Sequence, residues 1–341
     1  MNKKLIALAV FGACVAPAAM AQTAGGPVTL YGRVFETVVS VEGKAGGGNP
    51  AIPRRTRIDD QASLLGVRGT EDLGTGLKAF FQLETAFKPD QNDTTFAARN
   101  SGVGLEGGWG SVVIGRWDTP YKVSTYPIDA FGDLTMAGIS GLGHDQGNFD
   151  RRDQNMIQYW SPNFAGFAFK VMTQVNENKT ATTDPRDTSA NVTYTRGPLY
   201  VFGAYEDHKD PNATVKKEHA WSGGAAVTFG PIKVGAEYEE ITRHVVTGSD
   251  PAKRKEWLAN IVYTIANNQI IYQHQHSKDV ECKSDTIGYK YIFSKRTYFI
   301  AEYMRTDNSD ASTCSFATTA TFPVSKGVDV RAAAIGLQHV F

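Results

Sequence analysis

Residues 63–87 read SLLGVRGTEDLGTGLKAFFQLETAF, and the alternation within them predicts the fold. In its second half, small and apolar residues alternate with a set that carries charged and amide groups. The first set is Leu77, Ala79, Phe81 and Leu83, and the second is Lys78, Phe80, Gln82 and Glu84. Strict alternation is typical of a β-strand with two different faces. Because the turn residues of DLGTG join this run to a similar run before it, the stretch predicts a β-hairpin.

The same pattern repeats from VTLYGRV at Val28 to the final VDVRAAAIGLQHVF, and no helix periodicity of useful length interrupts it. Short turns such as Gly197-Pro198 alternate with longer polar connections such as 178–187 and 308–327. The count is sixteen strands. An even count, with short turns at one end and long loops at the other, predicts an all-β fold for residues 22–341, a 16-stranded antiparallel transmembrane β-barrel.

A soluble all-β domain is the alternative, and it would need a dry core between its sheets. The inward set of the first strands, however, includes charged and amide side chains that are costly to bury without partners. These are Arg33, Arg68, Lys78, Gln82 and Glu84. A barrel of sixteen strands leaves a water-filled channel that can hydrate them. The charge pattern therefore favours the barrel.

The first 21 residues have the layout of a cleaved secretory signal, with Lys3 and Lys4 before an apolar run and Ala19-Met20-Ala21 at its end. A transmembrane anchor is the alternative, but the run is too short to cross a bilayer of roughly 30 Å as a helix. Removing residues 1–21 takes two of the 35 basic residues and none of the 35 acidic ones, which leaves a net charge of about −2. A nucleic-acid partner is therefore not expected.

The segment 116–155 lacks sustained strand or helix periodicity, and a connection this long inside a compact domain is usually functional. Its basic residues include Arg116, Lys122 and Arg152, and its acidic residues include Asp118, Asp129 and Asp133. If the segment folds into the tube, it brings acids towards bases. The sequence therefore predicts an inward-folded loop that forms a charge-filtering constriction.

Two of the three cysteines, Cys282 and Cys314, remain after Cys14 leaves with the signal. An even pair in an oxidising compartment suggests a disulfide, although two unpaired thiols stay open as the alternative. The two residues fall in the last two external connections, which are neighbours in a sequential barrel. We therefore predict that they can bridge.

Six motifs are spread over the whole mature chain: VTLYGRV, LLGVRGTEDLGTGLKAFFQLE, VGLEGGWGSVVIGRWDTPYK, YWSPNFAGF, SKRTYF and AAAIGLQHVF. In their sequence and their order, these motifs resemble the Gram-negative general diffusion porins of the beta-proteobacterial type. The resemblance implies a 16-stranded barrel in the cell outer membrane, usually a homotrimer, with the third external loop folded into the lumen. It implies passive diffusion of small hydrophilic solutes and ions.

The resemblance also implies a basic wall that faces an acidic loop. Arg68 matches the basic residue of the family's LGxRG motif, Arg116 matches the arginine of GR, and Arg152 matches the basic residue before the sixth strand. Asp129 and Asp133 resemble the acid-bearing tip of the loop.

One departure from the family concerns the basic wall. Leu64 stands where the family commonly has an arginine, and Arg33 on the first strand is a candidate to compensate. Arg99 shares the parity of Val103 and Leu105, so simple alternation directs it outward unless the strand end bulges.

The terminal Phe341, with Leu337 and Ile335 on the same strand face, resembles the family's signal for the barrel assembly machinery. Expected partners are two further copies of the chain, outer-membrane lipid and lipopolysaccharide, and that machinery. No cofactor or metal is expected, because no Walker loop, CxxC pair or dinucleotide fingerprint occurs.

Two rival functions stay open. A barrel enzyme would need a nucleophile held beside a histidine, yet no GxSxG motif accompanies His274 and His276. An enzyme is therefore not expected. A receptor or adhesin with a plugged lumen is the other rival.

Overall fold

The computed structural model describes residues 28–91, 93–132, 135–138, 148–246, 252–315, 322 and 324–341. Nearly all of this is β-strand, and the predicted signal segment 1–21 lies outside it. No helix in the described ranges is long and apolar enough to cross a membrane.

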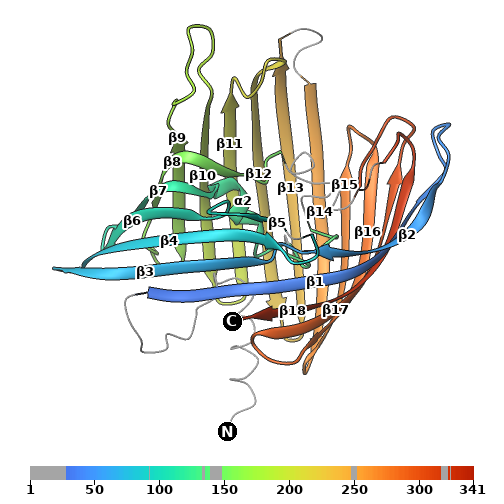
Figure 1. The fold of residues 1–341 in the computed structure, drawn as a ribbon, viewed down its shortest axis with the longest axis horizontal. Coiled ribbons are helices and arrows are strands. Elements are labelled where there is room, and N and C mark those ends of the chain that lie inside the picture. Colours follow the sequence, from blue (N-terminus) through green and yellow to red (C-terminus); the bar gives the residue numbers. More distant parts are fainter. Residues whose placement is uncertain are drawn as a thin grey trace.

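The elements follow one another in the order in which they are labelled in Figure 1. They are β1 (Val28–Lys44), β2 (Ile52–Asp60), β3 (Leu64–Gly74), β4 (Leu77–Lys88), β5 (Asp93–Thr95), β6 (Ser101–Gly107), β7 (Gly110–Asp118), α2 (Pro120–Thr125), β8 (Arg152–Trp160), β9 (Phe167–Gln174), β10 (Arg186–Arg196), β11 (Leu199–Lys209), β12 (Val215–Phe229), β13 (Ile232–Val245), β14 (Ala252–Ile265), β15 (Asn268–Ser277), β16 (Cys282–Ile292), β17 (Thr297–Asn308) and β18 (Asp329–Val340).

The strands form one closed antiparallel sheet, because β1 pairs with β18 as well as with the strands that follow it. The eighteen segments correspond to sixteen strands of the barrel. Successive halves of β1 pair with β3 and β2, and β4 pairs in the same way with β6 and β5, so each of these two pairs is one interrupted strand. The predicted 16-stranded antiparallel barrel is confirmed.

The two interruptions have a local backbone cause. Ala62, between β2 and β3, and Ala97, between β5 and β6, both adopt positive φ angles, of 59° and 54°. This left-handed conformation is uncommon for residues other than glycine, and it turns neighbouring peptide groups out of the ladder. The carbonyl groups near both breaks become available to other donors.

The two faces of the barrel have opposite character. On the outer face, large apolar side chains are exposed, such as Val103 at 58% and Ile114 at 55%. On the inner face, polar side chains such as Gln158, Glu206 and Ser222 are buried. This is the reverse of a soluble protein and suits a strand wall with lipid outside.

Phenylalanines mark the end of the barrel with the short turns. Phe164, Phe167, Phe229 and Phe293 lie at or beside these turns and are exposed on the outside. Aromatic side chains gather at membrane interfaces, so these residues fit the boundary of the apolar band.

Candidate functional site

The connection between β7 and β8 lies against the inner faces of strands around the wall. The amide of Tyr121 donates to Oγ of Ser189 on β10 at 3.0 Å. Asn260 on β14 donates to the Ile128 carbonyl at 2.8 Å, and Gln273 on β15 donates to the Ala137 carbonyl at 2.7 Å. Ser189 lies on β10, whereas Asn260 and Gln273 are partners on the adjacent strands β14 and β15, so the described part of the connection crosses the inner face of several strands and occupies the lumen.

Helix α2 begins this connection, and its sequence explains why. Thr119 is the N-cap and accepts a hydrogen bond from the Lys122 amide at 3.2 Å, and Pro120 suits the first turn because it needs no amide donor there. On β10, Asn191 donates to the Pro120 carbonyl at 2.7 Å. The short helix is therefore bound to the wall.

Tyr121 is the buried anchor of α2. Its ring packs against Phe149, near the end of the same connection, with centroids 5.9 Å apart. Its hydroxyl donates to the carboxylate of Glu239 on β13. Burial, followed by the nearby Glu239 charge, raises the pKa of Tyr121 well above its ordinary value. The hydroxyl therefore stays a donor at neutral pH.

Asp118 is the centre of the charged contacts. Its carboxylate lies 2.7 Å from Nη2 of Arg152 and 3.6 Å from Nζ of Lys122. Asn100 donates to the other carboxylate oxygen at 2.7 Å and accepts a hydrogen bond from Nε of Arg152 at 2.8 Å. Lys122 also pairs with Asp150 at 3.0 Å.

The predicted places of two residues are wrong. Asp118 was expected on the acidic loop, but it ends strand β7 on the wall, where it is the cross-strand partner of Arg152. Lys122 was expected on the basic wall, but it lies on α2 inside the loop. The reason is that β7 extends to Asp118, two residues past Arg116, before Thr119 begins the helix.

Backbone carbonyl groups at the two strand breaks accept hydrogen bonds from two of the predicted arginines. Arg33 donates through Nη2 to the Ala62 carbonyl at 2.6 Å. Arg116 donates through Nε to the Ala98 carbonyl at 2.9 Å. A backbone carbonyl orients a guanidinium without cancelling its charge.

A third predicted arginine, Arg68, is held by a ring. Its guanidinium lies over the ring of Tyr31 on β1, 5.0 Å from the centroid. All three arginines therefore lie on the part of the wall formed by β1, β3 and β7.

Arg99 belongs to the same group, although simple alternation would turn it outward. Strand β6 begins only at Ser101, and the break at Ala97 resets the backbone direction, so the parity of β6 does not reach Arg99. Its Nε lies 3.8 Å from a carboxylate oxygen of Glu84 on the inner face of β4. In the sequence, only the possibility of a β-bulge at the strand end allowed for an inward direction of Arg99.

Asp129 and Asp133 were predicted at the acidic tip of the loop. Asp129 accepts hydrogen bonds from the amides of Phe131 and Gly132, both at 3.1 Å, so its carboxylate caps its own turn. Asp133 lies outside the described residues.

A second charged cluster joins the end of the connection to β10, β11 and β12. Both ring nitrogens of the buried His208 face carboxylates, Glu206 at 2.9 Å and Glu218 at 3.0 Å. Phe149 stacks on the imidazole with centroids 4.5 Å apart. Arg151 pairs with Asp187 at 2.9 Å. No sequence motif signalled this cluster, because its members come from distant positions.

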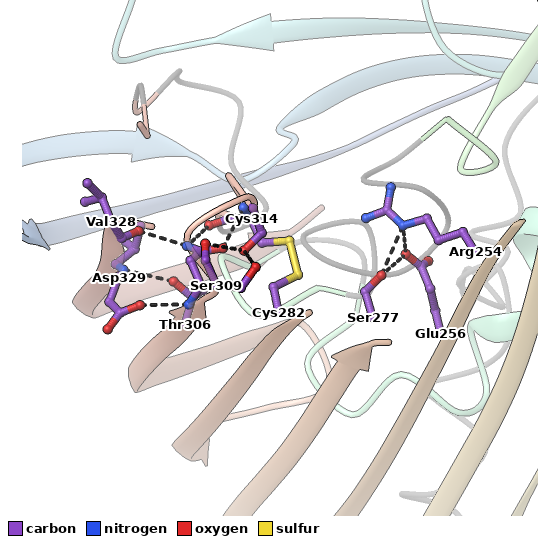
Figure 2. The surroundings of a disulfide bond; sticks show 12 residues. Arg254, Glu256, Ser277, Cys282, Thr306, Ser309, Cys314, Val328 and Asp329 are labelled. Carbon is purple, nitrogen blue, oxygen red and sulfur yellow. Dashed lines mark hydrogen bonds and ion pairs between the residues drawn. A yellow bond between two sulfur atoms is a disulfide. The ribbon is translucent and has the colours of Figure 1, made fainter. Parts of the chain in front are cut away.

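Cys282 and Cys314 are joined by a disulfide, with their Cα atoms 6.3 Å apart (Figure 2). Both side chains are fully buried. Asn308 donates to the Cys314 carbonyl at 2.9 Å and accepts a hydrogen bond from its amide at 2.8 Å. The bond attaches the connection after β17 to the start of β16.

Among the described ranges, no three His, Cys, Asp or Glu side chains are grouped so that they could hold a metal ion. His274 contacts Asp285 at 2.8 Å, and His276 accepts a hydrogen bond from the indole of Trp257 at 3.2 Å.

Comparisons with known proteins agree with this geometry. A family model described as Gram-negative porin matches residues 5–311. The chain is 31% identical to outer membrane porin protein 32 of Delftia acidovorans over the full length of both chains. It is 29% identical to major outer membrane protein P.IB of Neisseria meningitidis serogroup A, across 87% of this chain and 91% of that one.

A solved structure is also similar. It is an anion-selective porin from Comamonas acidovorans, with a TM-score of 0.80 and 28% identity, covering 92% of this chain and 99% of the other.

Proposed function

The chain belongs to the Gram-negative porin family of outer-membrane proteins, and from this premise we propose that it forms a water-filled channel for passive diffusion of small hydrophilic solutes and ions. Proteins of this family are channels rather than enzymes. The inner face of charged and amide side chains supports an aqueous path.

The constriction, in this proposal, lies between the loop that begins with α2, which contacts β9, β10 and β11, and the part of the wall that carries the predicted arginines. On one side are the arginines of the wall, Arg33, Arg68, Arg99, Arg116 and Arg152. The nearby carboxylates are Glu84 and Asp118. Opposed charges at close range set a local field that sorts ions by sign, while the width of the opening limits their size.

We infer a preference for anions. The observation that supports it is the way in which neighbouring groups hold the guanidinium groups of Arg68 and Arg116. Arg68 is held by a ring and Arg116 by a backbone carbonyl, so neither of these contacts neutralises the positive charge of the guanidinium. Arg33 is the cross-strand partner of Leu64 and shares its face, so it lies beside the position where the family commonly has an arginine. The similar Comamonas protein, which is anion-selective, supports the same sign.

The experiment is a planar bilayer recording of the purified protein in a salt gradient. We expect stepwise conductance and a reversal potential whose sign corresponds to anion preference. A zero or cation-type reversal potential would contradict the proposed selectivity. An absence of conductance steps, together with no solute-dependent swelling of reconstituted liposomes, would contradict the channel itself and favour a plugged barrel.

We further propose that the channel assembles as a homotrimer, with lipid and lipopolysaccharide around it, after insertion by the barrel assembly machinery. The terminal Phe341 is exposed on the outside with Leu337 and Ile335, and its amide closes the strand by donating to the Gly32 carbonyl at 3.0 Å. An accessible apolar strand end suits recognition by that machinery. Measuring the mass of the detergent-solubilised complex tests the trimer.

A further inference from the structure

Three half-buried aromatic side chains gather on the inner face of neighbouring strands. They are Phe80 on β4, Trp117 on β7 and Trp160 on β8, and we call them the aromatic patch. The ring of Trp160 lies 6.1 Å from that of Phe80 with an angle of 27° between planes, and 5.3 Å from that of Trp117 with an angle of 57°. Beneath them are the buried side chains of Val113, Met156 and Met172.

Strand alternation places Trp160 in the lumen, and the rings of Phe80 and Trp117 contact it there. Trp160 lies two residues after Gln158, which is buried and donates to the Asp118 carbonyl of the constriction. Ile157, of opposite parity on β8, is exposed on the lipid side. An aromatic cluster on the wet side of a channel is not explained by contact with lipid.

Glycines on β6 make room for the patch. A Cβ added to Gly104 would lie 2.4 Å from Cζ of Phe80, which real Cβ atoms do not approach so closely. The ring of Phe80 therefore lies across β6 over Gly104, its cross-strand partner. Any side chain at that position would collide with the ring. A Cβ at Gly102 would lie 3.2 Å from Cγ2 of Val113, in the layer below.

A cation lies at the edge of this surface. Nζ of Lys170 on β9 is 5.2 Å from the centroid of the Trp160 ring. In the part of the chain that the structure describes, Lys170 forms no ion pair with a carboxylate. The acid that acts on its charge is Asp118, so a solute carboxylate against the rings would supply the direct counter-charge that the described residues do not provide.

The patch follows the constriction along the channel. Trp117 precedes Asp118 directly, whereas Trp160 ends β8 beside the short turn 161–166. Short turns lie on the periplasmic side of outer-membrane barrels. A solute that has passed the charged residues therefore meets the patch next.

We propose that the aromatic patch and Lys170 form a lumenal binding subsite for small aromatic carboxylates. This inference rests on the proposed channel function and deepens it by naming a class of solute. A flat ring contacts the aromatic faces while its carboxylate pairs with the ammonium group. An aliphatic acid of the same size satisfies only the second contact, and a neutral aromatic molecule satisfies only the first.

Benzoate and cyclohexanecarboxylate, which have the same charge and nearly the same size, are the probes. Each is titrated into a bilayer that holds single channels in potassium chloride. We expect a saturable decrease in conductance, with half-saturation by benzoate at a concentration at least about threefold lower than by cyclohexanecarboxylate, as aromatic pairing contributes.

Three variants locate the effect. Trp160→Leu is expected to remove the preference for benzoate, and Lys170→Gln is expected to weaken both anions. Lys290→Gln is the matched control, because Nζ of Lys290 also lies over a ring on the wall, that of Tyr298 at 4.6 Å, away from the patch. It should leave the preference for benzoate unchanged.

Equal half-saturation by the two acids in the wild type would overturn the subsite. A preference for benzoate that persists in Trp160→Leu would also overturn it. So would a loss of that preference in Lys290→Gln as large as the loss in Trp160→Leu. Wild-type conductance in plain potassium chloride tests the channel separately. If no conductance occurs, or if a variant does not conduct, saturation-transfer NMR of benzoate with the folded protein in detergent decides the subsite, and an equal signal from wild type and Trp160→Leu overturns it.

Discussion

The carboxylate of Asp118 and the guanidinium of Arg152 are cross-strand partners on β7 and β8 and form an ion pair of 2.7 Å. The same carboxylate lies 3.6 Å from Lys122 on the loop helix. One acid is therefore shared between a base of the wall and a base of the loop. Lys122 also pairs with Asp150 at 3.0 Å, so two acids and two bases meet here, and Asp118 joins the loop to the wall.

Removing this acid is expected to strengthen the preference for anions. In Asp118→Asn, Arg152 and Lys122 lose a shared counter-charge while the amide keeps hydrogen-bonding capacity. A unit charge about 4 Å away is worth about 1 kcal/mol in water, so we expect the anion-to-cation permeability ratio to rise by roughly two- to fivefold. Reversal potentials in a salt gradient measure this. Asp310→Asn, at an exposed external position, is the control.

The converse is expected for the wall. Arg116→Ala and Arg152→Ala each remove a cation from the constriction and should lower the anion-to-cation ratio by roughly two- to fivefold, with a smaller effect at high salt. Arg296→Ala, in an exposed short turn, should change nothing. Unchanged reversal potentials in both wall variants would remove these residues from the selectivity filter.

The anchor of α2 is expected to control the steadiness of the current. Tyr121→Phe keeps the ring against Phe149 but removes the hydroxyl that donates to Glu239. Loss of a buried donor to a carboxylate costs about 1–3 kcal/mol, so the loop should leave its position more often. We expect more brief closures in single-channel records. Tyr289→Phe removes a hydroxyl at the exposed outer surface and is the control; equal noise in both variants would contradict the anchor.

Alternation along the strands was enough to predict the barrel. Successive side chains of a strand point to opposite faces, so side chains that face lipid and side chains that face water recur with a period of two residues. The prediction failed where the backbone leaves the ladder. Arg99 follows the left-handed Ala97 and turns inward, and β7 continues far enough to take Asp118 into the wall. Beyond a break in a strand, the two-residue alternation no longer predicts which face of the barrel a side chain points to.

Other parts of the site depend on contacts between distant residues. The cluster around His208 joins the end of the loop to β11 and β12, and no local pattern predicts which carboxylates meet its ring. The aromatic patch depends on the absence of a side chain at Gly104, two strands away from Trp160. These contacts follow from packing in three dimensions rather than from spacing in the chain.

The disulfide is expected to protect the last external connection rather than to hold the barrel. It closes 32 residues of chain from Cys282 to Cys314, for which removal typically costs about 2–4 kcal/mol. The sixteen strands keep their own ladder, so the loss should be local to the segment between β17 and β18.

Lys326 is exposed in that segment, and its carbonyl accepts a hydrogen bond from Asn49 at 2.9 Å. After reduction, or in Cys314→Ser, we expect trypsin to cleave at Lys326 at least several times faster. Cleavage at Lys179, exposed in the connection between β9 and β10, serves as the internal control because it should not depend on reductant. Alkylation without reductant should add no mass to the untreated protein. Equal cleavage rates with and without reductant would show that the bond does not restrain this connection.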